Sequence, residues 1–336
     1  MFKRTIHRLI ILCFCMAASA VTAEEPAAAF RAECAKKAAA GEDIAIPGAD
    51  GWLFLRPELR HISVGPFWGE AAAKVSKATS PDKADPLPAI VDFHTQLKAA
   101  GIELILAPVP CKALVYADKL GGPAEGRMDT IHKEFYQQLA AKGVKVLDLA
   151  DAFAKEKAKD AAGPLLYCKT DTHWTPYACE LTAKLIKQQL GSPAWLKAKP
   201  DAFKTAPETR TIIGDLTDGK GSEELPVRVV TGADGTVLED KASPVILLGD
   251  SHTLVFHIGE ELHGTGAGLA DQLAAELGIA VDVIGVRGSG ATPARVSLMR
   301  RAKAAPGIAG KKVVIWCFAA REFTESTGWS LVPVVK

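Results

Sequence analysis

Short apolar runs alternate along this sequence with longer stretches of helical periodicity, and this alternation is the feature that most restricts its fold. Five runs have the length of a buried strand and stop near Gly, Pro, Asp or Ser: residues 102–110, 144–151, 244–251, 280–286 and 311–318. Helix-like stretches precede or follow them at residues 86–101, 127–143, 175–191, 266–278 and 293–305. Strands that alternate with helices predict an α/β sandwich with a mostly parallel sheet.

Residues 195–242 interrupt the alternation, because they are rich in Gly, Asp, Thr and Pro. This composition predicts an irregular insertion or a small β excursion, with one strand at Val227–Val230, and not a separate domain. No internal repeat or low-complexity tract is present. We therefore expect residues 24–336 to form a single domain.

The first 23 residues have the pattern of a secretory signal peptide. Three basic residues precede an apolar run from Leu9 to about Ala18, and small residues follow up to Ala23. The run is too short for a comfortable membrane span. We predict cleavage after Ala23 and export to the periplasm, with an uncleaved inner-membrane anchor as the alternative.

Export bears on the cysteines that follow the signal, which are Cys34, Cys111, Cys168, Cys179 and Cys317. An oxidising compartment predicts one or two disulfides, and the odd number leaves at least one thiol over. Cys168 or Cys179 can staple the loop between them, whereas Cys317 is expected to be a small buried hydrophobe. The sequence contains no Cys-x-x-Cys pair, so we expect no structural zinc site.

The charge of the chain argues against a nucleic-acid partner. The formal net charge is +1, and no long basic run is present. Binding to a phosphate backbone requires clustered Lys and Arg side chains.

A serine follows the apolar run at residues 244–251, in the tripeptide Gly249-Asp250-Ser251. Ligands of open α/β sheets bind at the carboxyl ends of strands, where a serine can face a crevice beside N–H groups suited to an oxyanion. Ser and Asp also cap helices at such positions. This stretch alone leaves a nucleophile and a helix cap both open.

The segment "KTDTHWTP" at residues 169–176 supplies what a nucleophilic serine needs. A serine requires a base within hydrogen-bond reach, and the base requires an orienting acceptor. Asp171 and His173 can fill these roles, although the pair alone also fits a polar turn before the helix from Pro176. Together with Ser251, the pair favours a Ser-His-Asp triad.

A metal site is the competing interpretation. Asp171-x-His173 and Asp250-x-His252 resemble fragments of two-metal phosphoesterases. Such enzymes need further His and Asn ligands at strand ends, and the remaining histidines lie in helical or loop-like contexts. We therefore expect no metal and no cofactor. The Gly-x-Ser-x-Gly elbow of α/β hydrolases is also absent, because Thr253 occupies the last position.

Six segments together resemble the AlgJ/AlgX-type polysaccharide O-acetyltransferases, which have SGNH-hydrolase-like domains. The resemblance spans roughly residues 45–326, and the ordered pair "DTHW" and "GDS" is its most specific part. In chain order the segments are "DGWLFLRPEL" (50–59), "LAPVPCKALVY" (106–116), "YCKTDTHW" (167–174), "LLGDSHT" (247–253), "RGSGATPAR" (287–295) and "WCFAAREFTES" (316–326).

The resemblance implies a three-layer α/β/α SGNH-like sandwich of circularly permuted order, in which the Asp-His pair precedes the serine. It implies that Ser251 is the nucleophile, His173 the general base and Asp171 its orienter. It further implies O-acetylation of an exopolysaccharide such as alginate, with a membrane-bound O-acyltransferase as the acetyl donor. The chain ends at Lys336, so we expect no C-terminal carbohydrate-binding module of the AlgX type. His252 has no implied role.

Two further residues are candidates for binding the substrate. Arg287 either binds an oxyanion or acidic sugar or is a surface arginine before a Gly-rich turn. Trp174 either stacks on a sugar ring or packs over the loop that carries His173.

The sequence leaves three further functions open beside acetyl transfer. An acetylesterase would use the same triad and differ only in the acceptor of the acetyl group. A metal-dependent phosphoesterase would use the Asp-x-His fragments as ligands. A non-catalytic polysaccharide-binding protein would keep the fold without the chemistry.

Overall fold

The computed structural model describes residues 24–124, 126–159, 163–199, 201–233, 235, 239–304 and 307–335. The predicted signal peptide lies outside the described residues, so its cleavage stays a prediction. None of the helices within these ranges combines the length and the hydropathy that a membrane span requires.

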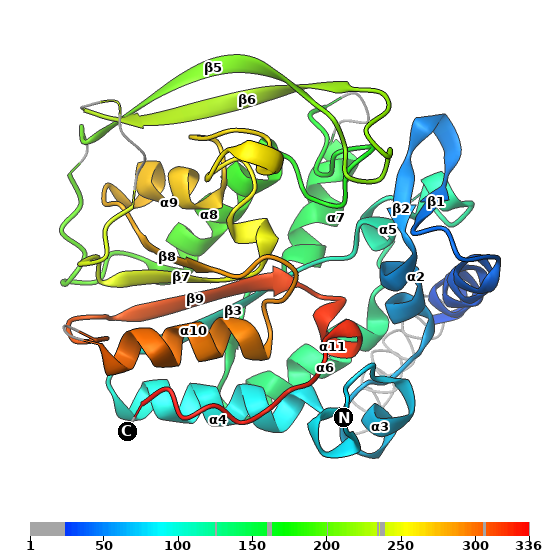
Figure 1. Cartoon of the computed structure of the whole chain (residues 1–336), viewed down its shortest axis with the longest axis horizontal. Helices are drawn as coiled ribbons and strands as arrows, with labels where there is room; N and C mark the ends of the chain where they lie inside the picture. Colours follow the sequence, from blue (N-terminus) through cyan, green and yellow to red (C-terminus); the bar gives the residue numbers. More distant parts are fainter. Residues whose placement is uncertain are drawn as a thin grey trace, which may run out of the picture.

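A five-stranded parallel sheet forms the centre of the molecule, with the strand order β4-β3-β9-β7-β8 (Figure 1). Each of the five predicted runs contributes one strand, which confirms the sequence-based expectation. Strands β3, β7 and β9 are almost wholly buried because both faces of the sheet are covered. The strands are β3 (Glu103–Val109), β4 (Lys145–Val146), β7 (Val245–Gly249), β8 (Asp282–Gly285) and β9 (Val313–Ala319).

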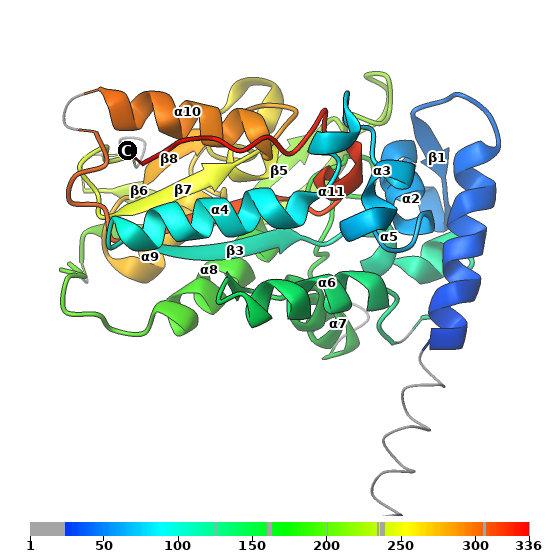
Figure 2. The same cartoon turned by 90° about the horizontal axis from the view of Figure 1, so that it is seen from below.

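Helices form a layer on each face, as the three-layer prediction requires. Figures 1 and 2 show α4 (Pro86–Ala99) and α10 (Thr292–Lys303) on one face, and α8 (Pro176–Leu190) and α9 (Leu269–Leu277) on the other. Helix α6 (Thr130–Ala141) packs beside β4, and α7 (Leu149–Lys159) beside β3.

Local sequence sets where two of these helices begin. Asp85 accepts a hydrogen bond from the N–H of Leu87, and Thr175 accepts one from the N–H of Ala178. A proline occupies the first turn of both helices, where its missing N–H costs nothing. The cap at Thr175 matters for the site, because it ends the loop that carries His173.

The interrupting segment is more regular than predicted. It forms a long antiparallel hairpin of β5 (Phe203–Ile212) and β6 (Glu223–Gly232), which lies over α8 and α9 at the top of Figure 1. The predicted strand Val227–Val230 is only the middle of β6. The sequence pattern missed β5 because nearly all its side chains are exposed, so no apolar face marks it.

The remaining elements gather at the carboxyl end of the sheet, beside the tips of β3 and β9 (Figures 1 and 2). Residues 24–39 form a helix at the edge of this group. Helix α2 packs against both α5 and α11. The group comprises β1 (Ala45–Pro47), β2 (Leu53–Leu55), α2 (Arg56–Ser63), α3 (Ala72–Val75), α5 (Lys112–Val115), α11 (Glu322–Glu325) and the 3₁₀ turns η1 (Ala49–Gly51), η2 (Gly69–Ala71), η3 (Pro81–Lys83) and η4 (Ala117–Leu120).

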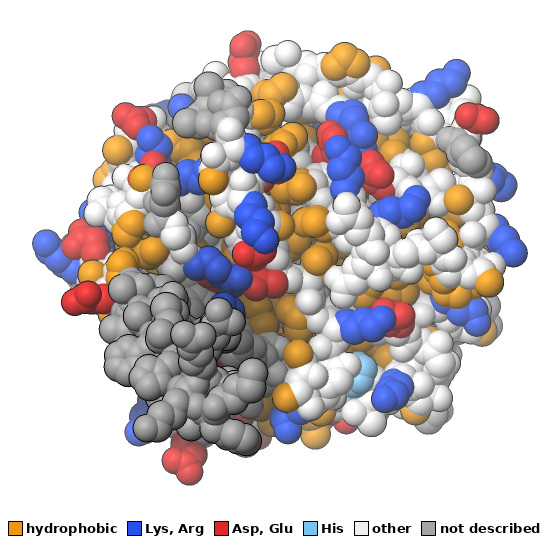
Figure 3. Space-filling model, turned by 180° about the vertical axis from the view of Figure 1, so that it is seen from behind, with side chains coloured by type: hydrophobic (Ala, Val, Ile, Leu, Met, Phe, Trp, Pro, Cys, Tyr) orange, Lys and Arg blue, Asp and Glu red, His pale blue; other side chains and the backbone are white. Residues whose placement is uncertain are grey.

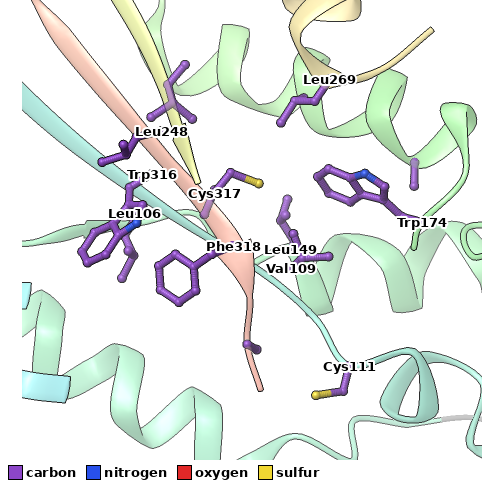
Figure 4. Packing of buried hydrophobic residues seen from close by; sticks show 14 of the residues in the cluster. Leu106, Val109, Cys111, Leu149, Trp174, Leu248, Leu269, Trp316, Cys317 and Phe318 are labelled. Atoms are coloured by element: carbon purple, nitrogen blue, oxygen red, sulfur yellow. The ribbon is translucent and has the colours of Figure 1, made fainter. Parts of the chain in front are cut away.

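The state of the cysteines differs from the sequence-based prediction of one or two disulfides. Cys34, Cys111, Cys168, Cys179 and Cys317 are all buried and free, so the predicted disulfides do not form among the described residues. Burial raises the pKa of Cys34 to about 12. The prediction for Cys317 is confirmed, since its side chain is fully buried in the core, on the other face of β9 from Trp316 and Phe318 (Figure 4).

Charges of both signs are mixed on the surface. On the face in Figure 3, Lys and Arg side chains lie beside Asp and Glu side chains, with hydrophobic atoms between them. Interspersed charges of this kind create no extended field of a single sign.

Candidate active site

Ser251 follows the end of strand β7 by two residues and is the first residue of the 3₁₀ turn η5 (Ser251–Thr253). Asp250 is the cap of this turn, because its carboxylate accepts a hydrogen bond from the N–H of His252 (2.9 Å). A Cβ atom at Gly249 would lie 1.7 Å from the carbonyl oxygen of Cys317, so only glycine lets the strands approach so closely. Since Asp250 caps the turn, the hydroxyl of Ser251 is available for another partner.

Asp171 and His173 lie on a short loop that closes on itself through a bridge between Tyr167 and Trp174. The Oδ1 atom of Asp171 accepts two hydrogen bonds from His173, one from its backbone N–H (2.8 Å) and one from Nδ1 (2.7 Å). This local pattern turns the imidazole so that Nδ1 faces the carboxylate and Nε2 points away from it.

The structure brings the three predicted residues together. Nε2 of His173 lies 2.8 Å from Oγ of Ser251, within hydrogen-bond distance. Asp171 is fully buried and His173 is nearly so. The resulting chain of Asp171, His173 and Ser251 has the geometry of an orienter, a base and a nucleophile, assembled from segments 78 residues apart.

The second carboxylate oxygen of Asp171 has partners that the sequence did not indicate. Oδ2 accepts a hydrogen bond from the N–H of Asp215 (2.9 Å) and lies 2.8 Å from Nε2 of His263. Burial by itself would raise the pKa of Asp171. The hydrogen bonds from His173 and His263 outweigh it and hold this pKa well below its usual range.

These contacts bear on the metal interpretation. Ligand atoms of Asp171, His173 and Asp215 lie within 4.8 Å of one another. However, all four acceptor positions of the Asp171 carboxylate are taken by protein donors. Asp250 and His252 are bonded to each other instead, with Oδ1 3.2 Å from Nδ1. The donor set therefore fits an orienting carboxylate better than a metal ligand.

Trp174 is not a platform for a sugar ring. Its side chain is 0% exposed and lies in the buried cluster that also contains Leu149 and Leu269 (Figure 4). Its Nε1 donates a hydrogen bond to the carbonyl oxygen of His252 (3.2 Å). With no ring face open to a ligand, the structure supports the packing role that the sequence left open.

Arg287 pairs with two acidic side chains at the surface. Its side chain is 46% exposed, and its guanidinium lies 3.2 Å from Glu261 and 3.5 Å from Glu260, both of them exposed. These are the contacts of a surface arginine, which the sequence also allowed.

Backbone groups near Ser251 are better placed for an oxyanion. The N–H of Ser251 has no acceptor among the described residues. The loop before α10 lies against this backbone, because a Cβ at Gly290 would be 3.1 Å from the nitrogen of Asp250 and 2.3 Å from Cβ of Phe318. A glycine is therefore required there, and its backbone lies beside the nucleophile.

Lys112, to which the sequence assigned no role, holds the backbone of the loop that carries Asp171 and His173. Its Nζ is buried and donates hydrogen bonds to the carbonyl oxygens of Leu53 (2.6 Å), Lys169 (2.9 Å) and Asp171 (3.0 Å). Burial lowers the pKa of Lys112 to about 8, although neighbouring acidic groups oppose the shift. The side chain fixes the backbone on both sides of Thr170.

Sequence reasoning missed His263 and Asp215 as members of the site. His263 lies twelve residues after Ser251 in a Gly-rich stretch, and Asp215 lies in the interrupting segment. Neither belongs to a motif with Asp171. The connection between β5 and β6 carries Asp215 and the loop after η5 carries His263, so only the tertiary structure brings both to this carboxylate.

The structure combines a parallel sheet between two helical layers with a serine, a histidine and an aspartate joined by hydrogen bonds, and this combination fits the SGNH-hydrolase-like class of α/β proteins. Within that class the assignment is specific. The chain belongs to the ALGX family, the SGNH hydrolase-like domain of the acetyltransferase AlgX, which it matches over residues 45–320. The resemblance inferred from the motifs is thereby confirmed.

Curated relatives carry the names of both branches of this family. The "Probable alginate O-acetylase AlgJ" of Pseudomonas syringae pv. tomato is 30% identical over 172 residues, which are 51% of this chain and 39% of that protein. The alginate biosynthesis protein AlgX of Pseudomonas fluorescens is 24% identical over 181 residues, 48% of this chain and 37% of that protein. The match therefore spans less than half of the length of these relatives.

Two solved structures share the fold. The O-acetyltransferase domain of Pseudomonas putida AlgJ superposes with a TM-score of 0.60 at 23% identity, covering 83% of this chain and 92% of that one. Pseudomonas aeruginosa AlgX superposes with a TM-score of 0.57 at 19% identity, covering 82% and 61%. At these identities the likeness establishes the fold alone.

Proposed function

We propose that this protein is an O-acetyltransferase that acetylates hydroxyl groups of an exopolysaccharide through an acetyl-serine intermediate. The observation that carries the proposal is the hydrogen-bonded chain from Asp171 through His173 to Ser251, with distances of 2.7 and 2.8 Å. Membership of the AlgX acetyltransferase family supports acetyl transfer as the reaction. The names of the curated relatives favour alginate or a similar polymer as the acceptor.

The reaction proceeds in two balanced steps. Nε2 of His173 takes the proton of Ser251 as Oγ attacks the carbonyl carbon of an acetyl ester, and the same proton passes to the departing alcohol. A sugar hydroxyl then gives its proton to Nε2 and attacks the acetyl-serine, and the proton returns to Oγ. The N–H of Ser251 stabilises the oxyanion in both steps, a contribution of roughly 10²–10³ in rate for each donor.

The reaction would take place in the periplasm and would draw its acetyl groups from a membrane protein. The N-terminal pattern supports export to the periplasm, where polymer acetylation would take place. A membrane-bound O-acyltransferase would supply the acetyl group, because an exported protein has no access to cytoplasmic donors.

An acetylesterase is the second candidate, since the same three residues would serve it. The two activities differ only in whether a sugar hydroxyl or water attacks the acetyl-serine. Incubating the protein with an acetyl donor and a mannuronate oligosaccharide separates them. Acetylated oligosaccharide in excess of free acetate indicates a transferase, whereas free acetate alone indicates an esterase.

The test of the serine chemistry compares two matched variants. Ser251→Ala should lower the turnover of a chromogenic acetyl ester by at least about 10³-fold and abolish acetylation of the protein in intact-mass spectra. Ser289→Ala is the control, because Oγ of Ser289 donates to Glu322 and does not contact the histidine. Wild-type turnover by Ser251→Ala would contradict the proposal.

A further inference from the structure

The segment after η5 folds back over the loop that carries Asp171 and His173, which we call the acid–base loop. The N–H of Phe256 bonds to the carbonyl oxygen of Leu262 (2.7 Å), and the N–H of Ala267 bonds to the carbonyl oxygen of Phe256 (2.9 Å). A bridge between Ile258 and Thr265 closes the loop that contains the 3₁₀ turn η6 (Glu260–Leu262). We call residues 256–267 the fold-back loop.

The fold-back loop holds its backbone in an unusual conformation. Phe256, Glu260 and His263 have φ angles of 59°, 52° and 67°, in the left-handed region that side chains other than glycine rarely adopt. Strain of this kind persists only where surrounding contacts determine the conformation, and it clusters at functional sites.

His263 makes the contact that this conformation permits. Its side chain is 8% exposed, its ring packs against Phe256 with 5.4 Å between centroids, and its Nε2 lies 2.8 Å from Oδ2 of Asp171. An ionised carboxylate can only accept hydrogen bonds, so Nε2 of His263 carries the proton and is the donor. A bulky aromatic partner and a charged acceptor thus hold the imidazole from two sides.

We propose that His263 is a positioning residue of the active site, whose Nε2–H fixes the Asp171 carboxylate so that Oδ1 stays on Nδ1 of His173. This inference rests on the proposed function, because it concerns the same triad. It also gives the fold-back loop a purpose. The loop starts five residues after Ser251 and contains His263, which contacts Asp171, so one continuous segment connects the serine to the loop that carries Asp171 and His173.

The other contacts of Asp171 show why a second imidazole matters. Oδ1 is held by two donors that both belong to His173, only two residues away. Without His263, Oδ2 would keep only the N–H of Asp215. With one donor fewer on Oδ2, the carboxylate rotates more easily about its bond to Cβ, and rotation carries Oδ1 away from Nδ1 of His173. Small displacements of catalytic groups are costly in rate.

The test uses two variants of His263 and one control in the full chain. His263→Phe keeps a ring against Phe256 but has no donor, whereas His263→Gln places an amide N–H near the position of Nε2. The control is His94→Phe on α4, outside the site. We expect His263→Phe to lower kcat for an acetyl ester by roughly tenfold to one hundredfold with an unchanged KM. The kcat of His263→Gln should stay within about threefold of the wild-type value, and the kcat of His94→Phe should equal the wild-type value.

A second measurement reports on geometry without turnover. In nitrogen-15 spectra of the histidine side chains, the Nδ1–H signal of His173 should be protected from exchange in the wild type and in His263→Gln, and lost in His263→Phe. Equal losses of kcat in both variants, or an unchanged kcat and an unchanged His173 signal in His263→Phe, would overturn the inference. If Ser251→Ala retained full activity, the proposed function would fail, while the His173 signal would still decide the role of His263.

Discussion

Nε1 of Trp174 donates a hydrogen bond to the backbone carbonyl oxygen of His252 across 3.2 Å, joining the residue after His173 to the residue after Ser251. The bond is buried on both sides, and the indole ring lies 5.7 Å from the imidazole of His252. The spacing between Ser251 and His173 therefore depends on a direct cross-link between their neighbours, and not only on their own contact.

Replacing Trp174 by Phe should lower the free energy of unfolding and kcat, but not weaken polymer binding. The carbonyl oxygen of His252 would lose its donor inside the core, at a cost of about 1–3 kcal/mol. Polymer affinity should stay unchanged because the ring is buried. Urea unfolding, ester turnover and oligosaccharide titration measure the three effects. Trp195→Phe, at a partly exposed position, is the control; a loss of affinity specific to Trp174→Phe would show that the ring contacts sugar.

Replacing Lys112 by Met should destabilise the protein strongly. Three backbone carbonyl oxygens, those of Leu53, Lys169 and Asp171, would lose a charged donor in the interior. Breaking a buried network of this kind costs about 3 kcal/mol or more. Lys145→Met is the matched control, because Lys145 pairs with Glu103 at the surface and should change stability by less than about 1 kcal/mol. Similar urea midpoints for the two variants would contradict this role of Lys112.

Stability should fall as the pH rises from about 6.5 to 9, because of His257. Burial would lower the pKa of His257, but hydrogen bonds to Asp271 (3.0 Å) and Glu239 (3.4 Å) raise it from 6.5 to about 9. A raised pKa adds stability that is complete below the unfolded value and is lost as the pH passes the folded value. The loss is on the order of 3 kcal/mol.

The measurement is the urea midpoint across this pH range in the wild type and in His257→Gln, in which the fall should be much reduced. His94→Gln is the control, because burial lowers the pKa of His94, and a lowered pKa cannot make stability fall as the pH rises. A slope that is the same in His257→Gln and in the wild type would rule out His257 as its origin.

The thiols should be inert in the folded protein and free after unfolding. All five cysteines among the described residues are buried and unpaired. Burial holds the pKa of each thiol above its usual value, and a neutral thiol is a poor nucleophile. An aromatic disulfide reagent should label none of the five without denaturant and all of them in urea. A non-reducing peptide map that showed a Cys168–Cys179 link would contradict the free state of these two residues.

Much of the fold could be predicted from the sequence because its signals are local. Apolar runs of strand length marked β3, β7, β8 and β9, and helical periodicity marked the helices between them. The hairpin strand β5 escaped detection for the opposite reason. Its backbone pairs with β6 along ten residues, but its side chains face solvent, so nothing in its pattern distinguishes it from a loop.

In the candidate site, too, the residues that the sequence identified are those with a local signal. Asp171 and His173 are two residues apart, and their mutual hydrogen bonds are a property of a short turn. Ser251 follows a strand end, a position that the pattern identified. For Trp174 and Arg287 the sequence left substrate binding and a structural role both open, because exposure and ion pairing depend on residues distant in the chain. The contacts in the structure favour the structural role for each.

The sequence by itself determined the class of fold and the parallel sheet, and it singled out Asp171, His173 and Ser251 as candidate site residues. It could do so because strand length, helical period and turn chemistry are encoded within a few residues. The tertiary structure alone decided that Asp250, and not Ser251, caps the turn after β7, and that Trp174 braces the loop from inside the core. It also decided that His263 reaches Asp171 from ninety-two positions away. Such contacts follow from how the layers pack, since the free energy that holds a buried charge comes from whichever donors the fold brings to it.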